Sequence, residues 1–191
     1  MTGPCLLLLA LLAATPEQTP LTLEIRAFNG TEDVTAETRV TVHKAGDRGN
    51  PVGRTHVGEA QSFIQVLPGI YDAQAVQEKR GRVVNIRWAE RLVVMPYPDE
   101  AGHHLQVINF AAGYGALQVR RLSGDLTAGV LALFPSGERS QPAPSAHAGP
   151  HYVLFVVPAG RYDILIKDTP EGTWHTGIEV PLDRTRLWVV P

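Results

Sequence analysis

The sequence predicts an all-β protein made of two tandem β-sandwich repeats. Short runs such as VTVHK and FIQV alternate apolar and polar residues, and Gly, Pro, Asp and Asn separate them. The phrase PGIYDAQAV at Pro68–Val76 returns in altered form as PAGRYDILI at Pro158–Ile166. No stretch after the N-terminal region keeps a 3.6-residue apolar period, so we expect almost no helix. One sheet alone would leave its apolar face in water, so two sheets must pack in each repeat.

The N-terminus, MTGPCLLLLALLAATPEQTP, predicts a signal peptide. Its apolar run Leu6–Leu12 is too short to cross a bilayer, and small residues suited to cleavage follow it. We expect residues 1–14 to be removed and residues 15–20 to form an exposed arm, which predicts a periplasmic or secreted protein. A buried strand or an uncleaved anchor is the alternative, because the first residues lack Lys and Arg. Cys5 precedes the apolar run, so no lipid-anchor cysteine is expected and no disulfide can form in the mature chain.

The repeat extends well beyond the tyrosine phrase. Six segments recur in the same order, and the length differences between them fall in loops. These pairs include LEIR with LQVR, DVTA with DLTA, VLP with VVP, and LQV with LWV. We therefore expect a first repeat at residues 21–110 and a second repeat at residues 111–191, joined by the short segment AAGYG.

The order of these segments resembles prealbumin-like or Ig-like sandwich modules. It is similar to the carboxypeptidase regulatory-like and PEGA-like domains of bacterial envelope proteins. The resemblance covers both repeats and rests on the turn-and-strand signature formed by these residues: Pro68, Gly69, Tyr71, Pro158, Gly160 and Tyr162. It implies a sandwich fold, a bacterial envelope setting and a non-catalytic role. Each tyrosine is expected to be buried, with its hydroxyl bonded to nearby backbone.

Composition and motifs favour no catalytic chemistry. Seventeen basic and nineteen acidic residues give a net charge of −2, which indicates no nucleic-acid partner. The seven histidines are scattered, and only His147 and His151 have a chelating spacing. There is no G-x-S-x-G elbow and no phosphate-binding glycine loop. We expect no catalytic residues, no metal and no cofactor.

Two features are candidates for contact with a partner. Lys79, Arg80 and Arg82 surround Gly81 in a predicted hairpin, and Arg87 follows on its second strand, opposite in face to the neighbouring apolar residues. Such charges are either a solvated face that resists aggregation or a site for an acidic partner. The second candidate is Trp188, which we expect to face outward because its neighbours Leu187 and Val189 match the inward pair Leu105 and Val107 of the first repeat.

Two further tryptophans occupy equivalent repeat positions. Trp88 precedes Leu92 and Val94, and Trp174 precedes Ile178 and Val180 in the same way. We expect both rings to belong to the sandwich cores.

The sequence thus predicts a non-catalytic adhesion, scaffolding or interaction protein whose partner is another envelope protein. A pair of carbohydrate-binding modules is the first alternative, because an outward aromatic ring can stack on a sugar. A metal-dependent hydrolase that uses the histidines is the second.

Overall fold

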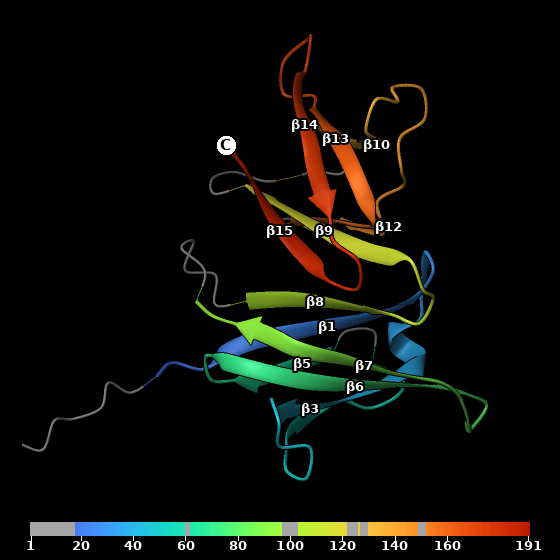
Figure 1. The fold of residues 1–191 in the computed structure, drawn as a ribbon, viewed down its shortest axis with the longest axis vertical. Helices are drawn as coiled ribbons and strands as arrows, with labels where there is room; N and C mark the ends of the chain where they lie inside the picture. The colour runs from blue at the N-terminus through green and yellow to red at the C-terminus, as the bar shows by residue number, and fades with distance from the viewer. Residues whose placement is uncertain (1–17, 60–61, 97–102, 122–125, 127–129, 149–151) are drawn as a thin grey trace, which may run out of the picture.

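The computed structural model describes residues 18–59, 62–96, 103–121, 126, 130–148 and 152–191 (Figure 1). The predicted signal peptide and the first three residues of the predicted arm lie outside this range. Within it the fold is all-β, with a 3-10 turn at Thr35–Glu37. The described part contains no helix long and apolar enough to cross a membrane.

The first repeat is a sandwich of two four-stranded sheets. In one sheet, strand β1 pairs with β2 and β5 and, in parallel, with β8; the other sheet has the order β4-β3-β6-β7. The strands are β1 (Leu21–Asn29), β2 (Glu32–Asp33), β3 (Thr38–Lys44), β4 (Pro51–Arg54), β5 (Ser62–Val66), β6 (Gly69–Lys79), β7 (Arg82–Val94) and β8 (His103–Asn109).

The second repeat has the same plan. One sheet has the order β11-β12-β9-β15, with β15 parallel to β9, and the other has the order β10-β13-β14. The strands are β9 (Tyr114–Arg121), β10 (Leu131–Pro135), β11 (His147–Ala148), β12 (Tyr152–Pro158), β13 (Gly160–Ile166), β14 (Thr173–Val180) and β15 (Thr185–Val190). Each sheet lies within one of the two residue ranges expected for the repeats, and the domain boundary itself stays a prediction.

The four sheets stack in four layers with three apolar cores between them. One core lies inside each sandwich, and these two cores include the fully buried Ile25 and Leu117. The third lies between the sandwiches and contains Phe28, Leu105, Val107, Ala116, Tyr152, Leu154 and Val156. The central strands of these two inner sheets are therefore covered on both faces, whereas β5 at the sheet edge exposes Phe63 and Gln65. Figure 1 shows β1 and β8 next to β9 and β15. This explains why strands β9 and β12 are buried almost throughout and do not alternate in burial.

The repeated tyrosines fix the turn that precedes β6 and β13. Tyr71 and Tyr162 are both buried. Each hydroxyl donates to the carbonyl oxygen four residues earlier, that of Leu67 at 2.5 Å and that of Pro158 at 2.7 Å. Pro68-Gly69 and Pro158-Ala159-Gly160 lie in these turns. The hydroxyl bond closes the turn while the ring fills the core, so the signature is structural in both repeats.

The expected core role of Trp88 and Trp174 is wrong. A β-bulge opposite Asp72 lies between Ala89 and Leu92, and it reverses the alternation so that both of these residues face the core. Trp88, which a regular strand would place on the same face as Leu92, is thereby turned to the outer face.

The second repeat carries the same bulge, opposite Asp163, and it turns Trp174 outward in the same way. Trp174 is 36% exposed. Gly177 in this bulge has a φ of 72° and Arg91 in the first has 54°, a left-handed conformation that suits glycine better.

The expected outward position of Trp188 is also wrong. Trp188 packs against the core of the second sandwich, on the same face of β15 as Val190, and its ring meets that of His175 edge-on at 5.1 Å. Leu187 and Val189 lie half-buried on the opposite face. Both faces of this inner sheet are apolar, so alternation alone does not distinguish them.

Substitution of Tyr162 should separate the turn bond from the packing of the ring. Tyr162→Phe removes one buried hydrogen bond and should lower the free energy of unfolding by about 1 kcal/mol. Tyr162→Ala also removes the ring and should cost about 3 kcal/mol or more. Chemical denaturation measures both. Equal stability of the alanine variant and the wild type would contradict the buried position.

Candidate interaction site

A buried polar network joins the two repeats. The Glu24 carboxylate accepts hydrogen bonds from Arg26 Nε at 2.7 Å and from the Tyr152 hydroxyl at 3.1 Å. The first two residues lie on β1 and the third on β12, and all three are buried. Burial, followed by the negative charge of Glu24, raises the pKa of Tyr152 to about 12, so the phenol stays a donor at neutral pH. The network fixes which part of β1 faces β12.

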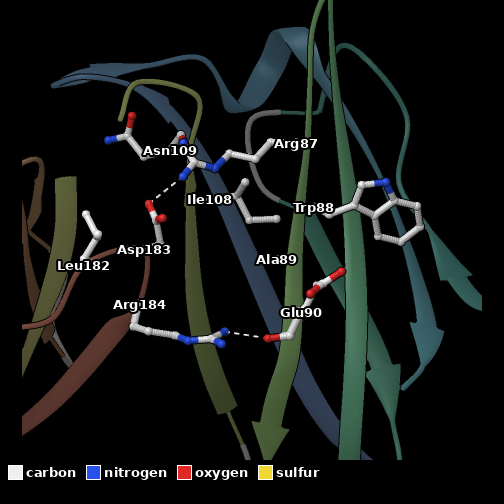
Figure 2. A pocket seen from close by; sticks show the side chains of 9 residues that line it. All are labelled: Arg87, Trp88, Ala89, Glu90, Ile108, Asn109, Leu182, Asp183 and Arg184. Atoms are coloured by element: carbon white, nitrogen blue, oxygen red, sulfur yellow. Dashed lines mark hydrogen bonds and ion pairs between the residues drawn. The ribbon is translucent and has the colours of Figure 1, made fainter. Parts of the chain in front are cut away.

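Arg87 links the two repeats, and we call this link the strut. It lies apart from the cations that surround Gly81 in the hairpin. Its guanidinium donates to the Asn109 carbonyl oxygen at 2.5 Å and pairs with Asp183 at 2.6 Å (Figure 2). It lies on the inward-facing side of β7 because of the same bulge that turns Trp88 outward. The prediction that it shares a solvated face with the hairpin cations is wrong.

A cleft of about 380 Å³ lies beside this strut (Figure 2). Its walls come from β7, β8 and the turn before β15. Arg184 reaches across it and donates to the Glu90 carbonyl oxygen at 2.6 Å. Both arginines of the cleft thus bond to groups of the other repeat, and these bonds hold the two repeats together at the cleft.

The outward tryptophans each carry an arginine on the ring face. The Arg48 guanidinium lies 4.1 Å from the Trp88 ring centre, and that of Arg139 lies 3.5 Å from the Trp174 ring centre. The two arginines also approach Asp72 and Asp163, each at 3.5 Å. We call these two sets of residues the arginine–tryptophan clusters. The first cluster holds the loop after β3 against the outer face of its sheet, and the second cluster does the same for the loop after β10.

The two aspartates of the clusters hold the bulges. The Arg91 and Gly177 backbone N–H groups donate to Asp72 and Asp163, at 2.9 and 3.0 Å. These bonds are the main reason why the pKa of each carboxyl lies below its ordinary value. Sequence reasoning missed the bulges. The repeated Tyr-Asp pair, with Gly177 three residues after Trp174, was the available signal.

The remaining basic candidates lie together at the tip of the β6–β7 hairpin, which extends past the rest of the sandwich (Figure 1). Lys79 pairs with Glu37 at 3.3 Å. Within the described residues, no carboxylate lies within ion-pairing distance of Arg80 or Arg82. Arg80 and Gly81 have φ values of 51° and 74°, as in the tight hairpin turns that favour Asn or Gly. Arginine in such a conformation is disfavoured, so its charge at this tip has a cost in stability.

Next to these cations, β7 exposes aliphatic side chains. Val83, Val84 and Ile86 are 54, 47 and 60% exposed. We define residues 79–86 as the hairpin tip. It combines uncompensated positive charge with exposed apolar surface, which is a composition suited to contact with another molecule.

The histidines do not gather into a site. Within the described ranges, no three His, Cys, Asp or Glu side chains are placed to hold a metal ion. The His147 ring lies tilted against that of Tyr152, with 5.3 Å between the ring centres, and His151 lies outside the described residues.

Comparison with known proteins gives distant similarities. No family model matches the sequence. No curated protein matches it either. Similar solved structures include the Bacillus anthracis TIE protein, with 14% identity over 90% of this chain and a TM-score of 0.31. This chain spans 34% of the length of that protein.

Two further similar structures are a fimbrial protein and an adhesin. The tip fimbrial protein Mfa3 from Porphyromonas gingivalis has 11% identity and a TM-score of 0.32, over 89% of this chain and 94% of that one. A putative adhesin from Bacteroides ovatus has 12% identity and a TM-score of 0.32, over 90% of both chains. At such TM-scores these similarities carry no argument about fold or function.

Loss of the buried carboxylate should destabilise the whole chain. Glu24→Gln removes the nearer carboxylate partner of the buried Arg26 and leaves only the longer ion pair with Asp33 at 3.5 Å, which should lower the free energy of unfolding by about 3 kcal/mol. The exposed neighbour Glu32 is the control, and Glu32→Gln should change it by less than about 0.5 kcal/mol. Similar small effects of both substitutions in chemical denaturation would contradict the network.

The bulge aspartates should make stability fall in acid. Because their folded-state pKa values are lowered, their charged forms stabilise the fold above the unfolded-state pKa, and this contribution is lost below about pH 4. Asp163→Asn should therefore lose less stability than the wild type between about pH 5 and pH 3. Thermal unfolding across this range is the measurement, with the exposed Asp168→Asn as control. Parallel plots of melting temperature against pH for the wild type and Asp163→Asn would contradict the stabilising role of the Asp163 carboxylate.

Proposed function

We propose that this chain is a non-catalytic, extracytoplasmic interaction protein that provides adhesion or scaffolding in a bacterial envelope. The observation that carries the proposal is the hairpin tip, where unpaired arginines and exposed aliphatic side chains project from a braced four-layer body. The envelope setting rests on the predicted signal peptide and on the resemblance to prealbumin-like envelope repeats.

The conformation of Arg80 supports a role for its charge. A turn residue with a positive φ is most stable as Gly or Asn, and yet this position holds a cation without a carboxylate partner among the described residues. Residues that are unfavourable for the fold are often retained for function. The hairpin tip is therefore the part of the surface that is best suited to bind a partner.

A carbohydrate-binding role is the second candidate. Trp88 and Trp174 lie on the outer faces at equivalent positions, as paired sugar-stacking residues would. Their rings already carry Arg48 and Arg139, so a sugar would have to displace a guanidinium from each ring. This makes the hairpin tip the better supported surface.

Retention experiments with the chain from Thr15 onward test the proposal. We expect an envelope protein of the native source to be retained by the wild type and lost with Arg80→Glu/Arg82→Glu, because these changes reverse the charge at the tip. The matched control Arg54→Glu/Arg161→Glu reverses two exposed arginines elsewhere and should retain the partner. Arg80→Asn should weaken retention while it keeps or raises the melting temperature, since Asn suits the turn.

Two results would contradict this proposal. Equal retention by the hairpin variant and the control would remove the hairpin tip from the interface. Retention of cell-wall glycan that is lost only with Trp88→Ala or Trp174→Ala would support the carbohydrate-binding candidate instead.

A further inference from the structure

Strand β7 is an edge strand whose two parts differ. It pairs with β6 along one side, and none of the described strands pairs with its other side. In its second part that free side is covered. Arg184 donates to the Glu90 carbonyl oxygen, and the N–H of Met95, the residue directly after the strand, donates to His104 Nε2 at 3.2 Å. Folded proteins commonly block exposed sheet edges in such ways, because bare edges invite pairing with other chains.

The first part of β7, Arg82–Ile86, lacks these bonds, although a β-bulge at Val84 interrupts its pairing with β6 between the pairs Gln77–Asn85 and Glu78–Val83. Among the described residues, no side chain or backbone group bonds the free edge of this segment. It extends past the sandwich with the hairpin tip, and it carries the exposed Val83, Val84 and Ile86. The chain thus protects one half of this edge and leaves the other half open.

Charge restricts what can pair there. Arg80 and Arg82 lie at the start of this edge, and Lys79 adds a third cation whose partner is Glu37. A second copy of this chain, paired edge to edge in the parallel orientation, would bring two such positive clusters close together, which is unfavourable. A strand with acidic side chains would bring opposite charges together.

We propose that the Arg82–Ile86 edge of β7 binds by strand addition, and that its partner is an extended segment of another protein in which acidic and β-branched residues alternate. Main-chain hydrogen bonds to the open edge supply the pairing, as in other cases of strand addition. The acidic side chains of the partner reach the two arginines, and its β-branched residues cover the exposed aliphatic side chains. Five added residues span roughly 17 Å, which is the length of the open segment. This inference rests on the proposed function and specifies the partner class.

A synthetic peptide provides a defined probe. We expect a labelled Glu-Val-Glu-Val-Glu-Val-Glu peptide to bind the chain in a fluorescence anisotropy titration. The same peptide with N-methyl groups on alternate residues keeps its charge and side chains but cannot pair along one edge. It should bind at least tenfold more weakly. Arg80→Glu/Arg82→Glu should weaken binding of the unmodified peptide by a similar factor, and Arg54→Glu/Arg161→Glu should leave this binding unchanged.

Hydrogen exchange locates the bound peptide. The backbone amides of residues 83–86 should exchange more slowly with the unmodified peptide bound. Equal binding of both peptides, absence of binding, or protection confined to other strands would overturn strand addition. The proposed function would survive these results if an envelope protein were still lost from the Arg80→Glu/Arg82→Glu variant, so the two failures are distinguishable.

Discussion

The structure depends on the face-to-face contact between the inner sheets of the two sandwiches. Their apolar core surrounds the buried carboxylate of Glu24, which is satisfied by Arg26 on its own strand and by Tyr152 on the facing sheet. A buried charge is tolerable only with such partners, so the network permits one alignment of the sheets. The strut made by Arg87 and Asp183 and the bond from Arg184 to Glu90 brace the rim of the same contact. Two similar sandwiches thereby become one body.

This contact determines what the surface can offer. The central strands of the inner sheets have no exposed face, so partners must meet the outer sheets, the loops or the sheet edges. The outer faces carry the arginine–tryptophan clusters, whose polar groups are already bonded. The hairpin tip is different, because Arg80 and Arg82 lack carboxylate partners in the described part of the chain and the adjoining edge of β7 is bare. We therefore expect recognition to occur at the tip of a rigid body.

Much of the fold could be predicted from the sequence. Alternating runs and the repeated Pro-Gly-Tyr phrase predicted an all-β chain with two sandwiches, and the structure confirms both. The faces of individual residues were harder to predict. A bulge of one extra residue reverses every side chain before it, which is why Trp88 and Trp174 face outward. Trp188 was misplaced because an inner sheet is apolar on both faces, so alternation gave no direction.

The candidate site was predicted less well than the fold. The basic residues of the hairpin were visible in the sequence, but the role of Arg87 as a strut depends on a distant Asp183 and on the bulge. The buried Glu24 network was not predicted at all, since LEIR reads as an ordinary alternating strand. Pairing between charged residues that are distant in the chain produces no periodic pattern in the sequence, so only the folded structure reveals it.

Native-state hydrogen exchange tests the central claim, that the two repeats are one cooperative body, most directly. Amides of β1 and β9 lie on the two sides of the shared contact. The account predicts that they exchange only through global unfolding, with the same free energy of opening in each strand. Two clearly different values, with one repeat opening while the other stays folded, would contradict it.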